Sequence, residues 1–326
     1  MVSRIGFGGI PITRLSLEEA VKVVRETIDR GINLIDTAYA YKHSEKMIGA
    51  AIKGLPREEL IITTKTHALD KNSLMLELDE SLRRLGTDYV DFYQIQNIRD
   101  KHRNEIFGPD GAYQGLQDAI SAGKVRHPAF SCHSIDLAVE IMKEGHFDIV
   151  QLPLNFINTA AADKAVSLAR ELDMGFIAMK PFGGGMLSSA RLVIRYLMQF
   201  DNVIADPGIE TIEELMEIVA LVEEGKTLDS DDLLEIEKLK NELSSTWCYR
   251  CDYCQPCPLD ISISSILSVK SLLKRMPKES AEKRRNDIKQ ARLCRECRDC
   301  VLRCPYDLDI PQLIKENIAY WEERME

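Results

Sequence analysis

The sequence predicts an α/β protein, a (β/α)8 TIM barrel followed by a small, mostly helical domain rich in cysteine. Two observations support this prediction. Over residues 1–225, short apolar runs alternate with amphipathic stretches at intervals of roughly 25 residues, the repeat of an ordinary (β/α)8 barrel. Beyond this part, eight of the nine cysteines fall between Cys248 and Cys304. An open doubly wound sheet is the alternative for the first part, but the regular units favour the barrel.

Eight segments have the composition of strands that are buried on both faces. Each is rich in Ile, Val, Phe or Tyr at successive positions, as expected of parallel strands covered by helices. In chain order they are Arg4–Ile10, Leu34–Thr37, Leu60–Lys65, Val90–Ile95, His127–Cys132, Ile149–Leu154, Phe176–Lys180 and Asn202–Ala205.

The amphipathic stretches between these strands predict helices. The first, Ser16–Arg30, begins with a capping box in which Glu19 follows Ser16 by three residues, and it ends at Gly31. The others are Asn72–Leu85, Tyr113–Ala122, Ser134–Lys143, Ala162–Leu172, Ser188–Phe200 and Ile212–Glu223. We therefore place the barrel at residues 1–225.

The rest of the chain divides into a linker and a cysteine-rich domain. Asp229–Leu243 has Leu and Ile at helical spacing, which predicts a bridging helix within residues 226–246. Residues 247–326 form the second domain, in which a helical region, Ser262–Arg292, separates two groups of cysteines.

Composition and charge exclude several classes of protein. The chain is 45% hydrophobic and 29% charged, so it is not disordered. It has no run of 18 apolar residues and therefore no membrane span. Residues 1–247 carry 27 Lys and Arg against 39 Asp and Glu, which disfavours nucleic-acid binding. Met1–Ile10 lacks the apolar block of a secretory signal. We expect the cytoplasm, where disulfides are rare and clustered cysteines indicate metal.

The cysteine spacing indicates which metal site is present. The first group follows a C-x2-C-x2-C-x2-C-P pattern, and the second follows C-x2-C-x2-C-x3-C-P. Structural zinc, the alternative, separates two close pairs of ligands by a gap, whereas this pattern resembles a two-[4Fe–4S] ferredoxin domain. That resemblance assigns one cluster to Cys248, Cys251, Cys254 and Cys304, and the other to Cys294, Cys297, Cys300 and Cys257.

Polar residues follow three neighbouring strands where a barrel carries its chemistry, at the strands' C-terminal ends. They are Asp36 and Tyr41 after the second strand, Lys65 after the third and Gln96 after the fourth. A tyrosine can protonate a developing alkoxide when its pKa is lowered. A lysine ammonium lowers it, and a carboxylate keeps the lysine charged. Such a set is suited to reduction of a carbonyl by hydride from a nicotinamide.

Several motifs occur in the order and spacing of one enzyme family. They are Gly31–Tyr41 followed by Ser44-Glu45, Lys65 in Ile-Thr-Thr-Lys, Ser81–Asp91, Phe130-Ser131 and Lys180-Pro-Phe-Gly-Gly-Gly185. Over residues 4–220 the sequence resembles the aldo-keto reductase family. Together with its tail, it resembles the subgroup with a C-terminal two-[4Fe–4S] ferredoxin-like domain.

The resemblance implies roles for individual residues. Asp36, Tyr41 and Lys65 are then three of the family's four catalytic residues, and Gln96 occupies the position of the fourth, a histidine. An amide can hydrogen-bond a carbonyl oxygen but cannot titrate, so His133 and His67 are considered as substitutes. The implied nicotinamide-binding residues are Ser131, Cys132, Gln151, Lys180, Gly183, Gly184, Gly185, Pro207, Gly208 and Glu210.

The segment Asp206–Thr211 indicates which nicotinamide is used. The family often places a basic residue there for the 2′-phosphate of NADPH, whereas this chain has Asp206 and Glu210. Carboxylates repel a phosphate and can accept from a ribose hydroxyl, so we favour NAD(H) over NADP(H). The alternative is that Glu210 only serves as an acid in the first turn of the next helix.

Together these features predict an iron–sulfur oxidoreductase with a small-molecule substrate. Its NAD(P)H-linked reduction takes place at the barrel mouth, and its clusters exchange electrons with a ferredoxin or flavodoxin. Hydride carries two electrons and a cluster accepts one, so direct exchange needs a flavin, for which the sequence gives no signal. A second hypothesis is a reductase whose ferredoxin domain is structural or binds a partner. A third is a non-catalytic barrel scaffold that carries an electron-transfer module.

Overall fold

The computed structural model describes residues 1–41 and 43–325, and the chain divides into two compact units. The first unit comprises Met1–Phe182 and Ser189–Thr227. The second comprises the short segment Gly183–Ser188 and the chain from Leu228 onward. The segment Gly183–Ser188 therefore groups with the cysteine-rich part, although it lies between two strands of the first unit in sequence.

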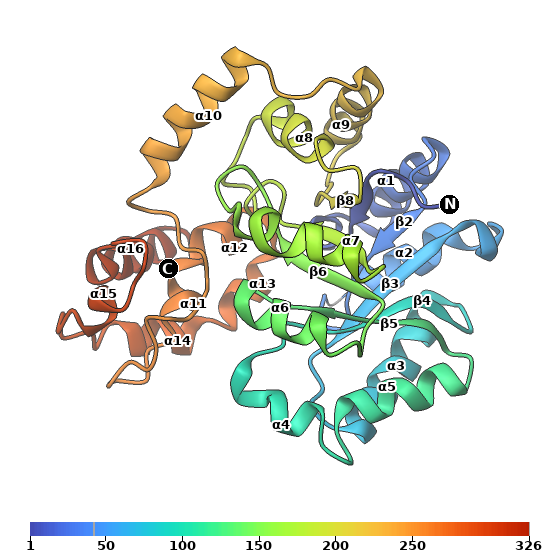
Figure 1. Ribbon diagram of the computed structural model, residues 1–326, viewed down its shortest axis with the longest axis horizontal. Helices are drawn as coiled ribbons and strands as arrows, with labels where there is room; N and C mark the ends of the chain where they lie inside the picture. Colours follow the sequence, from blue (N-terminus) through green and yellow to red (C-terminus); the bar gives the residue numbers. More distant parts are fainter. Residues whose placement is uncertain (42, 326) are drawn as a thin grey trace. The chain divides into compact units, whose positions relative to one another are not determined.

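Eight parallel strands form the first unit, each paired with the next in chain order (Figure 1). Isolated parallel bridges between Ile5 and Ala205 and between Gly8 and Gly208 join the first strand to the last. The sheet is thus a nearly closed barrel, and the predicted (β/α)8 fold is confirmed. The strands are β1 (Gly6–Gly8), β2 (Leu34–Asp36), β3 (Ile61–Thr66), β4 (Val90–Ile95), β5 (Val125–Ser131), β6 (Ile149–Pro153), β7 (Gly175–Met179) and β8 (Val203–Asp206).

Helices connect successive strands of the barrel, and α3 and α5 lie together on its outer side (Figure 1). Ser16 and Glu19 form the expected capping box, so α1 begins where the sequence places it. The sequence did not predict α2, because His43 before it provides no capping hydrogen bond. The helices are α1 (Leu17–Asp29), α2 (Ser44–Ile52), α3 (Lys71–Leu85), α4 (Arg103–Ile106), α5 (Ala112–Ser121), α6 (Ile135–Lys143), α7 (Ser167–Glu171), α8 (Ala190–Met198) and α9 (Ile212–Glu224).

Short turns of tighter or wider helix complete the first unit. Three are 3-10 turns at Pro11–Arg14, Arg57–Glu59 and Asp100–His102. The segment Ala162–Val166 is π-helical and leads directly into α7, so the helix predicted at Ala162–Leu172 is present in two parts.

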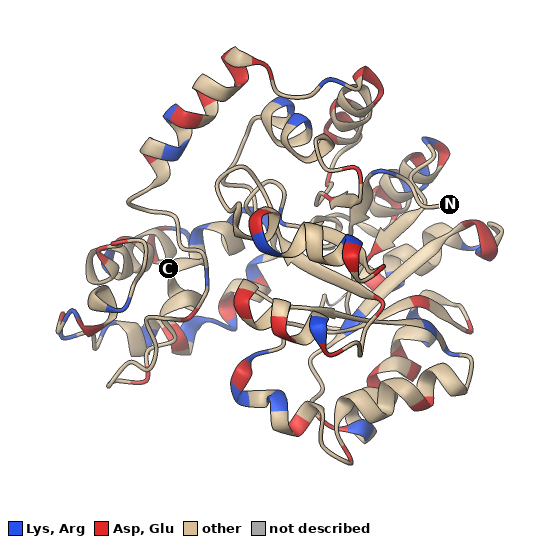
Figure 2. Ribbon diagram, in the orientation of Figure 1, with Lys and Arg blue, Asp and Glu red and all other residues tan. Residues whose placement is uncertain are grey.

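Charged side chains lie mainly on the helices and loops, while the strands are mostly uncharged (Figure 2). The charged residues within strands include Asp91 on β4, Arg126 on β5 and three buried residues at strand ends. Asp36, Lys65 and Asp206 are buried at the C-terminal ends of β2, β3 and β8. Among the residues that the structure describes, no helix is long and apolar enough to cross a lipid bilayer.

The second unit is helical. Its core is built from buried Ile, Leu and Val side chains around the fully buried Trp321, and the cysteines pack against this core. The C-terminal helix α16 was not predicted, whereas the expected helical region is present as four short helices. The helices are α10 (Ser230–Leu243), α11 (Ile263–Leu267), α12 (Val269–Arg275), α13 (Lys278–Glu282), α14 (Arg285–Ala291), α15 (Asp299–Leu302) and α16 (Ile310–Met325).

Candidate active site and cysteine-lined hollows

A buried ion pair lies at the centre of the candidate site. The Lys65 ammonium on β3 donates to both oxygens of Asp36 on β2, at 2.5 Å each, and to the Thr37 carbonyl at 2.8 Å. Lys65 is 2% exposed and Asp36 is 4% exposed. Burial alone would lower the pKa of Lys65, but Asp36, Tyr41 and Asp206 together outweigh it and raise that pKa. Lys65 is therefore a cation held in place by Asp36.

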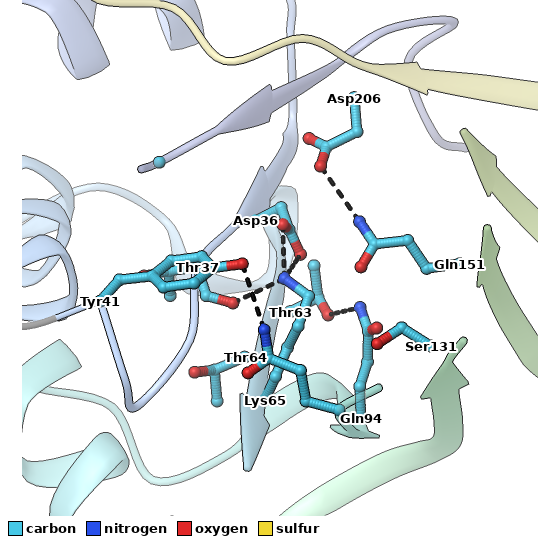
Figure 3. A network of polar contacts seen from close by, with 12 residues as sticks. Asp36, Thr37, Tyr41, Thr63, Thr64, Lys65, Gln94, Ser131, Gln151 and Asp206 are labelled. Carbon is cyan, nitrogen blue, oxygen red and sulfur yellow. Dashed lines mark hydrogen bonds and ion pairs between the residues drawn. The ribbon is translucent and has the colours of Figure 1, made fainter. Parts of the chain in front are cut away.

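Tyr41 lies beside this pair, and its side chain points toward Lys65 (Figure 3). The Lys65 nitrogen is 5.4 Å from the centre of the Tyr41 ring. The Gln96 side-chain amide donates to the phenol oxygen of Tyr41 at 3.4 Å. The structure thus brings together Asp36, Tyr41, Lys65 and Gln96, the four residues that the sequence singled out.

The acidity of Tyr41 differs from the sequence expectation. Burial raises the pKa of Tyr41, and Lys65 and the Gln96 hydrogen bond lower it by less. The carboxyl groups of Asp36 and Asp206 add to the increase. The lysine acts in the expected direction, but the phenol remains a weaker acid than free tyrosine.

Gln96 presents an unsatisfied acceptor at this position. Its Oε1 is buried and has no hydrogen-bond partner among residues 1–41 and 43–325. His67, one of the considered substitutes for a histidine, lies with its Nδ1 3.2 Å from the backbone carbonyl oxygen of Gln96. A buried polar atom without a partner is costly, so Gln96 Oε1 is suited to accept from a bound molecule.

The barrel contains a second carboxyl group that the sequence did not place there. Asp206 ends β8 and is 6% exposed, and the Gln151 side-chain amide donates to its Oδ2 at 3.1 Å (Figure 3). Burial raises the pKa of Asp206 well above its ordinary value, Asp36 adds to this, and Lys65 opposes it. Asp206 therefore lies inside the barrel, and the preference for NAD(H) that the sequence analysis drew partly from this carboxylate stays a prediction. The sequence feature that could have placed Asp206 inside the barrel is its position directly after the apolar run Val-Ile-Ala, at the end of a buried strand.

The residues expected at the nicotinamide ring lie on β5, β6 and the loop after β5. Ser131 Oγ accepts from the Asn97 backbone at 2.9 Å and keeps its own proton to donate. Cys132 is fully buried, and its thiol donates to the Ile98 and Ser134 carbonyls at 3.2 Å each. Burial raises the pKa of Cys132 to about 11. Cys132 is therefore part of the wall, whereas Ser131 can still contact a ligand.

His133 and Lys180 form a separate polar chain at neighbouring strand ends. The Lys180 ammonium lies 2.7 Å from His133 Nε2, and His133 Nδ1 lies 2.9 Å from the Asn97 side-chain oxygen. An ammonium can only donate, so Nε2 is the acceptor and Nδ1 carries the proton. His133 is thus engaged on both nitrogens.

The three glycines expected to hold a pyrophosphate belong to the second unit. All three have positive φ, and an added Cβ at Gly183, Gly184 or Gly185 would collide with Trp247, Ser271 or Arg275 respectively. Ser271 also donates to the Gly184 carbonyl at 3.0 Å. The glycines are required here for close packing within the second unit, a use that the sequence did not indicate.

The remaining candidates lie after β8. The Gly8 amide donates to the Pro207 carbonyl at 2.8 Å, and Gly208 bridges to Gly8, so these two residues close the barrel. Glu210 forms an ion pair with Arg14 at 3.3 Å. Its charge is therefore offset, which removes much of the electrostatic argument for NAD(H) over NADP(H).

Two hollows in the second unit are each lined by four cysteines. Burial raises the pKa of Cys248 to about 11 and that of Cys254 to about 12. A bound cluster would take the place of these protons, because metal ligation requires the thiolate. The four thiols of each hollow come from both sequence groups. One set is Cys248, Cys251, Cys254 and Cys304; the other is Cys257, Cys294, Cys297 and Cys300.

Comparison with protein families agrees with both parts of the chain. A model described as "Aldo/keto reductase family" matches residues 4–200, and one described as "4Fe-4S dicluster domain" matches residues 247–309. The second match favours iron–sulfur over the zinc alternative.

Similar proteins include the aldo-keto reductase YhdN of Bacillus subtilis, 30% identical over 221 residues. This match covers 62% of this chain and 64% of YhdN. The NADH-specific methylglyoxal reductase of Escherichia coli is 28% identical over 219 residues, 57% of this chain and 66% of that protein.

Solved structures share the barrel fold. An aldo/keto reductase of Klebsiella pneumoniae in complex with NADP and acetate superposes with a TM-score of 0.61 at 21% identity. That comparison covers 73% of this chain and 92% of the other. An aldo-keto reductase of Bacillus halodurans in its holo form gives a TM-score of 0.62, with the same identity and coverage.

Proposed function

The chain belongs to the aldo/keto reductase family and carries a C-terminal 4Fe-4S dicluster domain, and on that premise we propose that it is an iron–sulfur carbonyl reductase. One observation carries the proposal. Asp36, Lys65, Tyr41 and Gln96 come from three strand ends and the loop after β2, and they form one hydrogen-bonded and ion-paired group. In this group Tyr41 can donate a proton, and the other three side chains hold it in place or stabilise the charge that it leaves.

The side chains divide the work of protonating a carbonyl oxygen. A bound nicotinamide would supply the hydride. Tyr41 donates its proton to the oxygen that becomes the alcohol, and the Gln96 amide remains as a donor to the phenolate. The Lys65 cation stabilises the same negative charge, and Asp36 fixes Lys65. Gln96 supplies a hydrogen bond where a histidine would also supply a titratable proton.

The residues present fit a nicotinamide only in part. Ser131 and Gln96 offer a free hydroxyl proton and an unsatisfied acceptor, whereas Cys132 is turned into the wall. NADH and NADPH are both candidates, because Arg14 beside Glu210 is a cation that a 2′-phosphate could attract. Measuring the affinity of the protein for NADH and for NADPH under the same conditions decides between them.

For the cysteine-rich unit we propose two [4Fe–4S] clusters. Each four-cysteine hollow would hold one, so that the fourth cysteine of each sequence group serves the other group's cluster. The clusters would exchange single electrons with a carrier such as a ferredoxin or flavodoxin.

The alternative is a non-catalytic barrel that carries an electron-transfer module. Gln96 cannot titrate, and the pKa of Tyr41 is raised, both of which favour this second candidate.

One anaerobic experiment separates the hypotheses. Iron, absorbance and EPR are measured on the purified protein, and NADH or NADPH is then added with a panel of small aldehydes and ketones. Cluster bleaching by the nicotinamide supports electron exchange between the two units. Binding and carbonyl reduction without bleaching support a reductase whose clusters act separately. If neither nicotinamide binds, the scaffold alternative holds.

Tyr41→Phe tests the proton donor. We expect carbonyl reduction to fall by about 100-fold or more, because general acid catalysis of this kind contributes at least that factor. Cluster absorbance should not change. Tyr39→Phe is the matched control, since the Tyr39 ring lies against Arg84, 4.5 Å away, outside the group. Turnover retained in Tyr41→Phe would refute the assignment.

A further inference from the structure

The buried group at the strand ends has an excess of carboxyl groups. Asp36 and Asp206 are both nearly inaccessible, and the buried cation Lys65 is hydrogen-bonded to Asp36 and lowers the pKa of Asp206. Lys65 directs its hydrogen bonds to both oxygens of Asp36 and to the Thr37 carbonyl. With both carboxyls ionised, the interior would keep one uncompensated negative charge. Such a charge is far more costly to bury than a neutral group.

The surroundings of Asp206 show which carboxyl is neutral. Its Oδ2 accepts from Gln151, and its Oδ1 is buried with no hydrogen-bond partner in the part of the chain that the structure describes. Asp36 raises the pKa of Asp206, and the two residues lie on the strands to either side of β1, where Gly8 pairs with Asp36 and a Cβ on Gly6 would approach Asp206 Oδ1. Two carboxyl groups can share a hydrogen bond only when one of them carries a proton, as in paired carboxyls that share a single proton.

The barrel also leaves space for this pairing. Gly6 on β1 has no side chain, and a Cβ there would lie 3.3 Å from Asp206 Oδ1 and 3.0 Å from Leu34. Over residues 1–41 and 43–325, the groups that act on Asp206 are Asp36 from β2, Lys65 from β3, the Tyr41 phenol and the uncharged Gln151 from β6, and Lys65 is the cation among them.

We propose that Asp206 is held as a neutral carboxylic acid whose O–H donates to the Asp36 carboxylate, which makes it a positioning residue for the Asp36–Lys65 pair. The proton stays between the two carboxyls, so the group has no net charge with Lys65 protonated. The hydrogen bond from Asp206 keeps Asp36 oriented toward Lys65, and Lys65 in turn acts on Tyr41. The catalytic part of this inference rests on the proposed function, whereas the protonation of Asp206 does not.

Infrared spectroscopy of the whole protein tests the protonation directly. A buried carboxylic acid gives a C=O band distinct from that of carboxylates. We expect this band in the wild-type protein at neutral pH, shifted in D2O, and absent from Asp206→Asn. Asp201→Asn is the matched control, because Asp201 precedes β8 but is exposed and paired with Arg170, so the band should persist.

Turnover of the same variants tests the positioning role. Asn can still donate to Asp36 and accept from Gln151, so Asp206→Asn should keep its turnover within about threefold. Asp206→Ala loses the hydrogen bond and should lose about tenfold, the equivalent of about 1.4 kcal/mol. Asp206→Ala also replaces Asp206→Asn in the infrared test if the Asn variant does not fold.

The outcomes are distinguishable. Absence of the band from the wild type, or its persistence in a folded Asp206 variant, overturns the protonation. An Asp206→Ala variant that turns over like the wild type overturns the positioning role. A wild-type protein that shows the band but reduces no carbonyl compound overturns the proposed function alone.

Discussion

Replacing Lys65 with methionine tests the electrostatic design of the barrel interior. The substitution keeps the length of the side chain but removes its charge. It leaves Asp36 without its partner at 2.5 Å, next to Asp206, with both residues almost inaccessible. Removing one member of a buried ion pair costs about 3–5 kcal/mol, because the other is left as an uncompensated charge.

In a unit of this size, that loss corresponds to a decrease in melting temperature of about 6–20 °C. Circular dichroism melts of the wild type and Lys65→Met at neutral pH measure it. Lys124→Met is the matched control, since Lys124 forms a half-exposed surface pair with Asp79 at 2.6 Å. Such surface pairs contribute at most about 1 kcal/mol.

The stability that Lys65 contributes depends on pH in a direction that follows from its raised pKa. Because the pKa of Lys65 is raised in the folded protein, its contribution is fully present below the ordinary lysine pKa of about 10.4. It is lost as the pH rises through the higher folded value. In Lys65→Met the pair of carboxyls can take up one further proton in acid and so become uncharged, and the deficit should narrow as the pH falls from about 7 to about 4. A Lys65→Met protein within about 1 kcal/mol of the wild type at neutral pH would refute the reasoning.

Three further predictions concern other positions. Gln96→His should introduce an ionisation near pH 6.5 into the pH–rate profile, where the wild type shows none, and a profile without this step would contradict the role of Gln96. Cys297→Ser should lower the iron content by about half, because it removes a ligand of one of two clusters, whereas Cys132→Ser should leave it unchanged. Iron analysis of both variants checks this, and an equal loss of iron from Cys297→Ser and Cys132→Ser would contradict the assignment of Cys297 as a cluster ligand. Gly184→Ala should destabilise the protein by about 1–3 kcal/mol, because it combines a φ of 69° with a collision against Ser271. Gly86→Ala, at a φ of 68° in open space, should cost only about 1 kcal/mol in the same melts.

The local elements of this protein could be predicted closely from its sequence. Buried strands require continuous apolar runs, and β4 has the predicted bounds Val90–Ile95. Helix ends carry their own signals, as in the capping box at Ser16 and the left-handed Gly86 after α3. Where a helix lacks such a signal, as α2 does after His43, the sequence analysis missed it.

The candidate catalytic group could be predicted for a similar reason. Parallel strands of a barrel end on one face, so residues just after successive strands must meet there, as Asp36, Tyr41, Lys65 and Gln96 do. The cysteine spacing likewise predicted a cysteine-rich unit, and a 4Fe-4S domain matches it.

The tertiary structure alone decided what depends on side-chain direction and on contacts between distant segments. Strand register turned Asp206 into the barrel, where it accepts from Gln151, and burial raises its pKa well above the ordinary value. Packing against Trp247 and Ser271 gave the three-glycine loop a use that its composition did not reveal. The sequence determines which chemical groups are present and where the strands and most of the barrel helices lie. The folded chain decides which of these groups lose contact with water, and burial sets their charge.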